Sequence, residues 1–368
     1  MNQKIFIVFI AGVLFCDVQL MEAQQTKNNA ALFDWNNNFD RGHRQVDNPN
    51  AKKLSLIEVK GKRFVNASGD TILFRGVAIG DPDKIEQEGR WNKNLFGHVK
   101  EYGATLVRVP VHPVPWRMRS PVKYLQLLDQ AVDWCTELGM YVIIDWHSIG
   151  NLGMELFQDP IYYTTRQETY EFWRTIAMHF KGNNTVAFYE LFNEPTLCFG
   201  QLGSMSWSEW KKINENIIHL IRAYDTERIL LVAGFDWAYD LTPLRIEPIE
   251  AEGIGYVTHP YANKCSRPYV PKWDEAFGFA ANRYPVVATE FGFTLGTREG
   301  EDTDEYGKEI ITYLEERGMS WVCWVFDPEW RPNLIESWDT FKPTRSGEFF
   351  RKALRHEIEK NNLSKEKK

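Results

Sequence analysis

The sequence predicts one α/β domain, a single (β/α)8 TIM barrel, because strand-like and helix-like segments alternate eight times along it. The alternation extends over about 270 residues, close to the length that is typical of this barrel. No Gly-rich phosphate-binding fingerprint follows the first strand, which disfavours the alternative of a doubly wound open sheet. The predicted strands are 72–79, 105–111, 141–146, 186–192, 229–233, 255–257, 286–291 and 320–326, of which the fifth and sixth have the weakest signal.

Apolar residues recur with helical spacing between the predicted strands. The clearest sets are Leu125, Leu128, Val132 and Cys135, then Trp173, Ile176, Ala177 and Phe180, then Trp210, Ile213, Ile217 and Leu220. Glycines at 103, 139, 182 and 318 stand where helices should end, and a last helix is expected near 346–360. Ahead of the barrel, short strand-like runs joined by Gly-containing turns predict a β-hairpin lead-in that covers the bottom of the barrel.

The two ends of the chain do not read as parts of the barrel. Lys4 and the apolar run 5–15 are typical of an export signal, with a cleavage point at Ala23, so we expect a secreted protein. Lipid anchoring at Cys16 is a weaker alternative, since bulky Phe15 precedes it. We predict a signal peptide at 1–23, a polar arm at 24–52, the barrel domain at 53–361 and a charged tail at 362–368.

The composition limits the classes of partner and cofactor. The net charge is −7 and the only short basic block is the tail at 365–368, which argues against nucleic acid. No run after the signal reaches membrane-spanning length. The chain contains 14 Trp, which suggests a cleft that stacks on flat ligands. We expect a monomer without cofactor or metal. A disulfide between Cys198 and Cys265 stays open beside the alternative of free thiols.

Polar residues cluster at the ends of the predicted strands, where a barrel gathers its catalytic groups around one mouth. Two of them, Glu194 and Glu290, lie three βα units apart. Paired carboxylates hydrolyse acetals: one protonates the leaving oxygen while the other attacks the anomeric carbon or activates water. A separation of about 5–5.5 Å gives retention and about 6.5–9.5 Å gives inversion, and the sequence does not supply that distance. The other strand-end candidates are Arg108, His112, His147, Asn193, His259, Tyr261 and Trp324, with Trp330 in the loop after strand eight.

The ordered set of strand-end motifs resembles glycoside hydrolase family 5. The motifs are Arg108-Val-Pro, Asp145-Trp-His147, Asn193-Glu194-Pro, His259-Pro-Tyr261, Thr289-Glu290-Phe-Gly and Trp324, and they cover most of the chain in the right order. The resemblance implies a (β/α)8 retaining glycosidase in which Glu194 is the acid/base and Glu290 the nucleophile. It also implies that Arg108, His147, Asn193, His259, Tyr261 and Trp324 surround the sugar that is cleaved.

Elementary chemistry supports these roles. A nucleophile must be ionised, and Arg108 and Tyr261 are suited to stabilise a charged Glu290. Asn193 suits the sugar 2-hydroxyl, and Trp324 offers a flat face to the ring. Other assignments stay open. Trp116 and Trp330 are either sugar platforms or hydrophobic filling, and His112 is either a pocket residue or a core residue. Glu190 faces the interior as a deep polar group or an ion-pair partner, without a catalytic assignment.

The predicted function is endo-hydrolysis of a β-1,4-linked glucan, a polysaccharide or oligosaccharide. Endo-β-mannanase and xyloglucanase activity are close alternatives, because the sequence does not reveal the loop geometry that would choose among them. A metal-dependent hydrolase using His147, His259 and a carboxylate is disfavoured, since no close pair of histidine ligands is present. A non-catalytic sugar-binding barrel is disfavoured because both glutamates are present.

Overall fold

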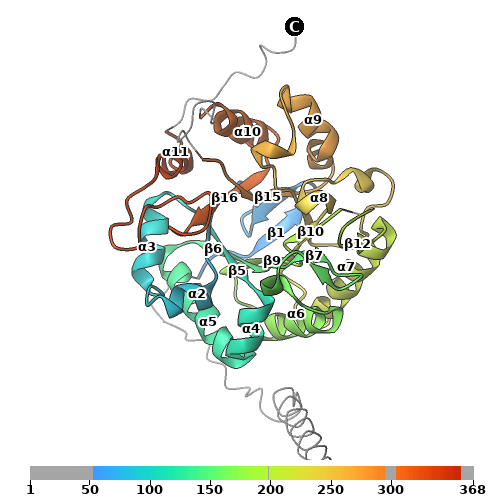
Figure 1. Ribbon diagram of the computed structural model, residues 1–368, viewed down its shortest axis with the longest axis horizontal. Coiled ribbons are helices and arrows are strands. Elements are labelled where there is room, and N and C mark those ends of the chain that lie inside the picture. The colour runs from blue at the N-terminus through green and yellow to red at the C-terminus, as the bar shows by residue number, and fades with distance from the viewer. Residues whose placement is uncertain (1–52, 198, 295–303, 358–368) are drawn as a thin grey trace, which may run out of the picture. The chain divides into compact units, whose positions relative to one another are not determined.

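The computed structural model describes residues 53–197, 199–294 and 304–357, and it contains a closed barrel of eight parallel strands (Figure 1). The strand order around the barrel is β13-β14-β15-β16-β4-β5-β6-β9. Closure confirms the predicted TIM barrel and rules out the open sheet. The barrel strands are β4 (Arg75–Ile79), β5 (Leu106–Val111), β6 (Tyr141–Trp146), β9 (Val186–Glu190), β13 (Ile229–Ala233), β14 (Ile254–Val257), β15 (Val286–Phe291) and β16 (Ser320–Phe326).

The predicted strands all exist. Four of their boundaries differ, two of them by a single residue, and the two larger differences have identifiable reasons. The first begins at Arg75 rather than at 72, because Thr71 and Ile72 pair with an earlier strand outside the barrel. The fourth ends at Glu190 rather than at 192, because the chain then turns away to form a separate short strand at Glu194–Pro195. The uncertain fifth and sixth strands are β13 and β14, each wholly buried.

Helices surround the barrel in the ring expected of alternating strands and helices (Figure 1). The predicted apolar residues of α5 and α6 are buried, and so are Trp210, Ile213 and Ile217 of α7. Leu220 is partly exposed, and its neighbour Ile221 is buried instead. Gly139 ends α5 in the left-handed conformation, with φ 68°, as its position predicted. The helices are α2 (Pro82–Gln87), α3 (Lys93–Glu101), α4 (Pro113–Arg119), α5 (Pro121–Leu138), α6 (Arg166–Phe180), α7 (Trp207–Arg222), α8 (Phe235–Ala238), α9 (Tyr269–Ala276), α10 (Glu305–Glu316) and α11 (Arg345–Leu354).

A small antiparallel sheet closes the N-terminal end of the barrel. It consists of β1 (Ile57–Lys60), β2 (Arg63–Asn66) and β3 (Thr71–Ile72), which correspond to the short strand-like runs predicted for the lead-in. Phe64 on β2 packs edge-on against Phe188 of β9, with ring centroids 5.1 Å apart, and joins the barrel's apolar core. The aromatic seal excludes water from this end and leaves the opposite end for chemistry.

The C-terminal end carries a second small sheet, formed by β7 (Ile149–Asn151), β8 (Leu156–Phe157) and β10 (Glu194–Pro195). A short hairpin, β11 (Phe199–Gly200) and β12 (Gly203–Ser204), follows it. None of the helices within the described ranges is long and apolar enough to cross a membrane. The predicted signal peptide, arm and tail, and Cys198 of the open disulfide pairing, fall outside the described residues.

Candidate active site

Glu194 and Glu290 reach the same space from opposite parts of the barrel. The backbone of Glu194 donates to the carbonyl of Ser148 at 3.1 Å, which fixes β10 alongside β7 after β9 has ended. Glu290 lies on β15, where the register with β16 shifts between Ala288 and Phe291. An oxygen of Glu194 and an oxygen of Glu290 lie within 4.8 Å of each other, so the carboxylates face one another across a short gap.

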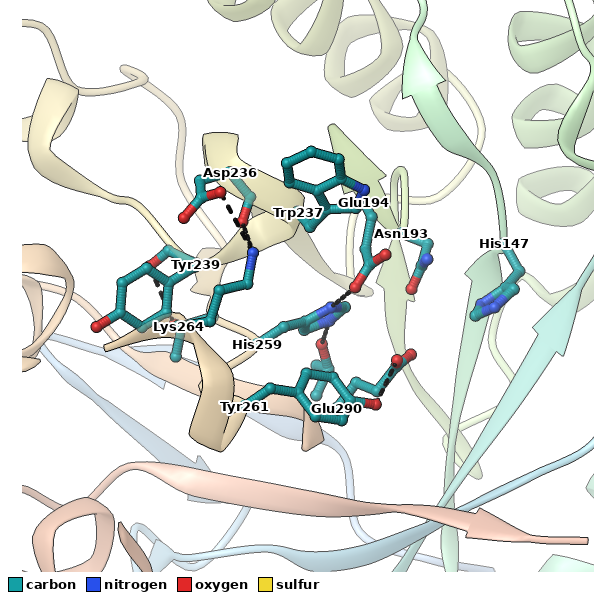
Figure 2. A network of polar contacts seen from close by, with 12 residues as sticks. His147, Asn193, Glu194, Asp236, Trp237, Tyr239, His259, Tyr261, Lys264 and Glu290 are labelled. Carbon is teal, nitrogen blue, oxygen red and sulfur yellow. Dashed lines mark hydrogen bonds and ion pairs between the residues drawn. The ribbon is translucent and has the colours of Figure 1, made fainter. Parts of the chain in front are cut away.

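The carboxylate of Glu290 is held from two sides. Arg108 donates to one oxygen at 2.8 Å. The hydroxyl of Tyr261 donates to the other oxygen at 2.8 Å (Figure 2). The pKa of Glu290 is raised overall, mainly by burial and also by the charge of Glu194, while the positive charges of His259 and Arg108 and the hydrogen bond from Tyr261 partly oppose that rise. These contacts therefore favour the ionised form that a nucleophile requires.

The carboxylate of Glu194 contacts His259, whose Nδ1 lies 2.9 Å from Oε1 (Figure 2). The other ring nitrogen of His259 lies 3.0 Å from the hydroxyl of Thr289. Burial lowers the pKa of His259, but the nearby carboxylates of Glu190 and Glu194 outweigh it and raise the pKa to about 9. The imidazole of His259 is therefore protonated at pH 7, and its Nδ1 can donate to the carboxylate of Glu194.

Arg108 is fully buried beneath the two glutamates and joins several acidic groups. Its Nε donates to Glu190 at 2.8 Å, and one terminal nitrogen contacts Asp145 at 2.9 Å and the side-chain oxygen of Asn193 at 2.6 Å. Burial would lower the pKa of Arg108, yet the surrounding carboxylates raise it above its ordinary value. For Glu190, burial raises the pKa, but Arg108 and His259 overcome this effect and lower it to about 2.

An aromatic wall completes the site. The ring of His147 stacks on Trp324 at 5.4 Å with an interplanar angle of 3°, and Trp324 stacks on Trp330 at 5.8 Å. His147 Nδ1 lies 2.6 Å from the carboxylate of Asp145. Burial lowers the pKa of His147 well below its ordinary value, so the ring is neutral at pH 7. His112 is held by Asp81 at 2.9 Å.

These groups surround a cavity of about 520 Å³, within the range typical of ligand sites. Seven of the sequence-predicted site residues line the cavity, and they include both glutamates. Arg108, Asn193 and His259 do not line it; each is 0 % exposed and lies behind the carboxylates. The seven lining residues are His112, His147, Glu194, Tyr261, Glu290, Trp324 and Trp330.

Sequence reasoning missed several contributors to the cavity. Tyr162 lines it from a 3-10 turn between β8 and α6, and its ring stacks on His112 at 5.6 Å. Its loop has no periodic pattern that would have singled it out. Ile149, Glu329 and Arg331 also line the cavity. Trp116, offered as a sugar platform, is instead 4 % exposed and packs edge-on against Phe172 at 4.9 Å, so the filling alternative holds.

Comparisons with known proteins agree with this geometry. A family model described as cellulase (glycosyl hydrolase family 5) matches residues 65–329. The solved β-glucanase SdGluc5_26A from Saccharophagus degradans is 44 % identical, with a TM-score of 0.80; the match covers 83 % of this chain and 94 % of that one, and a second structure of that enzyme contains cellotetraose.

Curated relatives are more distant. Endoglucanase E-5 from Thermobifida fusca is 26 % identical over 77 % of this chain and 58 % of its own length. Endoglucanase A from Butyrivibrio fibrisolvens is 25 % identical over 74 % of this chain and 60 % of its own length. This chain therefore spans about three fifths of the length of these two relatives. The family model extends over most of the chain, and the chain belongs to glycosyl hydrolase family 5.

Proposed function

We propose that this protein is a retaining endo-β-1,4-glucanase that cleaves its substrate by double displacement. The observation that carries the proposal is the gap of at most 4.8 Å between oxygens of Glu194 and Glu290. An inverting enzyme needs about 6.5–9.5 Å between its carboxyl groups to admit a water molecule, whereas a retaining enzyme needs about 5–5.5 Å. The endoglucanase names of the relatives and the cellotetraose complex support a β-1,4-glucan as the substrate.

In the first step, an oxygen of Glu290 attacks the anomeric carbon and forms a glycosyl ester. The bond from that carbon to the glycosidic oxygen breaks, and Glu194 delivers its proton to the departing oxygen. Arg108 and Tyr261 hold the attacking carboxylate in place and in its charged form. His259 holds the acid from the other side.

In the second step, Glu194 acts as the base. It takes a proton from a water molecule, whose oxygen attacks the anomeric carbon from the face that the leaving group vacated. The ester bond to Glu290 breaks, and the carboxylate is regenerated against Arg108. Two inversions give net retention of the β configuration.

Neighbouring side chains bind the sugar in this proposal. Asn193 Nδ2 is buried without a hydrogen-bond partner among the described residues, while its oxygen accepts from Arg108. The proposal assigns the sugar 2-hydroxyl as its acceptor, a contact that strengthens in the transition state and that requires the buried amide to become accessible when substrate binds. Trp324 and Trp330 present stacked aromatic faces to the sugar chain, and His112, His147 and Tyr162 supply polar edges.

The decisive assay measures reducing ends released from carboxymethyl cellulose, mixed-linkage β-glucan, xyloglucan and mannan. We expect the highest kcat/KM on unbranched β-glucans, with oligosaccharides of several lengths as early products. A preference for mannan or xyloglucan would replace the glucan assignment without changing the mechanism. Release of single sugars from the outset would contradict endo action.

Substitution tests the two glutamates. We expect Glu290→Ala and Glu194→Ala to lower kcat on polysaccharide by on the order of 10⁴- to 10⁶-fold, since each removes a group that forms or breaks a bond. Unchanged turnover in Glu290→Ala would remove the nucleophile assignment. Because Glu194, His259 and Glu290 lie close enough together to hold a metal ion, activity is also measured with a chelator. Activity that chelation abolishes and zinc restores would contradict the metal-free mechanism.

We further propose that the enzyme acts outside the cytoplasm. A β-glucan polymer is an extracellular substrate, and the export signal predicted at residues 1–23 supports the same location. Fractionation of the native host, with activity measured in the medium, tests this proposal. Activity confined to the cytoplasm would contradict it.

A further inference from the structure

A buried carboxylate beneath the active site has no part in the two chemical steps. Glu190 lies at the end of β9 and is 0 % exposed. The chain leaves the barrel wall between Glu190 and Glu194. Glu190 therefore remains deep in the barrel, while Glu194 reaches the cavity. An ionised side chain in such a place costs free energy unless its partners compensate for the lost water.

The partners of Glu190 divide into two arms. On one arm, Arg108 donates through Nε to Oε2 at 2.8 Å and through a terminal nitrogen to Oε1 at 3.1 Å. The guanidinium is thereby fixed side-on, with its remaining terminal nitrogen directed at Glu290 at 2.8 Å. A rigid, planar guanidinium transmits this orientation in a way that a flexible ammonium would not.

On the other arm, the hydroxyl of Thr289 donates to Oε1 of Glu190 at 2.8 Å. Because its hydrogen points at Glu190, that hydroxyl oxygen accepts a hydrogen bond from Nε2 of His259 at 3.0 Å. This contact orients the imidazole ring of His259 so that Nδ1 points at Glu194, 2.9 Å away. Figure 2 shows the contact between His259 and Glu194.

Thr289 can take part only because of a backbone irregularity. Adjacent residues on a regular strand point to opposite faces. The register shift between Ala288 and Phe291 allows Thr289 and Glu290, although consecutive, both to contact interior groups. The same strand segment therefore supplies the nucleophile and the link to the acid/base.

We propose that Glu190 is the positioning residue for both catalytic glutamates, acting on Glu290 through Arg108 and on Glu194 through Thr289 and His259. This inference rests on the proposed roles of Glu194 and Glu290. The charge of Glu190 also favours the protonated form of His259, whose Nδ1 faces Glu194. The titratable groups whose charges act on His259 are Glu190 on β9, Glu194 on β10, Glu290 on β15 and His147 immediately after β6.

The first test separates the two arms with substrates that differ in their need for an acid. Dinitrophenolate departs from a dinitrophenyl cellooligosaccharide without protonation, whereas a glucan leaving group requires the acid. For Glu190→Gln we expect kcat/KM, which reports formation of the glycosyl ester, to fall about 10²-fold on both substrates, because both arms lose their anchor. For Thr289→Val we expect a fall of about tenfold on glucan and less than about twofold on the dinitrophenyl substrate.

A matched pair of variants removes the ambiguity of a folding defect. Thr289→Ser keeps the hydroxyl and Thr289→Val keeps the shape, so recovery in Thr289→Ser alone assigns the effect to the hydrogen bond. Equal losses on both substrates for Thr289→Val would show a merely structural role and overturn the proposal. Wild-type kcat/KM on both substrates in Glu190→Gln would overturn it as well.

The second test is the pH profile of kcat/KM on glucan. Neutralising Glu190 removes a charge that favours the proton on His259, so the alkaline limb moves to lower pH in Glu190→Gln. The control is Asp225→Asn, which changes another buried carboxylate, one that accepts from Tyr189 at 3.0 Å and pairs with Arg228. We expect that control to lower the melting temperature without moving the limb.

An unmoved limb in Glu190→Gln, or an equal movement in Asp225→Asn, would contradict the proposal. Failure of the proposed function gives a different result. Activity that survives in Glu290→Ala removes the catalytic roles themselves, whereas an inactive Glu290→Ala beside a fully active Glu190→Gln removes only the positioning role.

Discussion

The barrel buries two arginines, one toward each end, and they are used differently. Arg108, at the C-terminal end, is 0 % exposed and contacts the carboxylates of Asp145, Glu190 and Glu290. Arg228, just before β13, is 1 % exposed and donates to the backbone carbonyls of Asn183, at 2.6 Å, and of Val186 at the start of β9, at 2.9 Å. Arg228 supplies hydrogen bonds to buried backbone carbonyls and so connects two segments of the chain. Arg108 instead stabilises a cluster of carboxylates that the fold alone would not need.

This contrast extends to the two ends of the barrel as a whole. At the N-terminal end, the rings of Phe64, Phe74 and Phe188 form an apolar plug, against which the ring of Tyr141 packs. At the C-terminal end, four acidic side chains surround one guanidinium and one imidazole. Apolar packing stabilises the N-terminal end. At the C-terminal end, burial of charged groups lowers stability but provides the groups that the reaction needs.

The largest expected effect comes from removing each arginine in turn. Either Arg108→Met or Arg228→Met should lower the free energy of unfolding by about 3–5 kcal/mol, since each leaves buried partners uncompensated. Only Arg108→Met should also lower kcat/KM per folded molecule, by about 10²- to 10³-fold, because the nucleophile loses a directed donor. Urea unfolding with kinetics on the folded fraction measures both. Equal kinetic losses in the two variants would erase the distinction between the ends.

We expect the pH dependence of the free energy of unfolding to arise from titratable groups at the C-terminal end of the barrel. The pKa of His259 is raised from 6.5 to about 9, so its contribution is complete below pH 6.5 and is lost as the pH rises through 9. The pKa of Glu190 is lowered from 4.5 to about 2, so its contribution is present above pH 4.5 and is lost as the pH falls toward 2.

Unfolding by urea at pH 5, 7 and 9 measures the alkaline part of this dependence. We expect the free energy of unfolding of the wild type to decrease between pH 6.5 and 9. In the His259→Gln variant, most of this decrease should be absent. Phe64→Leu, at the N-terminal end, serves as the control: it should lower stability by a similar amount at every pH. A pH dependence that persists unchanged in His259→Gln would contradict the assignment.

The smallest expected effect concerns the aromatic wall. Trp330→Ala should raise KM for oligosaccharides about threefold to tenfold with little change in kcat, because stacking contributes about 0.5–1.5 kcal/mol. Trp91 is the matched control, since it packs against Trp134 and Phe96 and does not line the cavity. Trp91→Ala should leave KM unchanged. Equal KM values in wild type and Trp330→Ala would remove Trp330 from the binding surface.

Local patterns predicted the elements of the fold well, because barrel strands are continuous apolar runs and helices carry periodic ones. Chain alternation also placed Glu190 in the interior, where it is the ion-pair partner of Arg108. What the sequence could not provide depends on geometry across the barrel. The inward turn of Thr289 depends on a register shift between strands, and the position of Tyr162 depends on an irregular loop. The gap between Glu194 and Glu290 depends on the closed barrel.

The central claim is that Glu290 forms a covalent bond to the sugar while Glu194 serves as acid/base. A 2-deoxy-2-fluoro cellobioside with a dinitrophenyl leaving group slows release of the ester more than its formation, so the intermediate accumulates. Digestion and mass spectrometry should then find one fluorocellobiosyl group on the peptide that contains Glu290. A group on the peptide that contains Glu194, or stoichiometric dinitrophenolate release with no labelled peptide, would contradict the account.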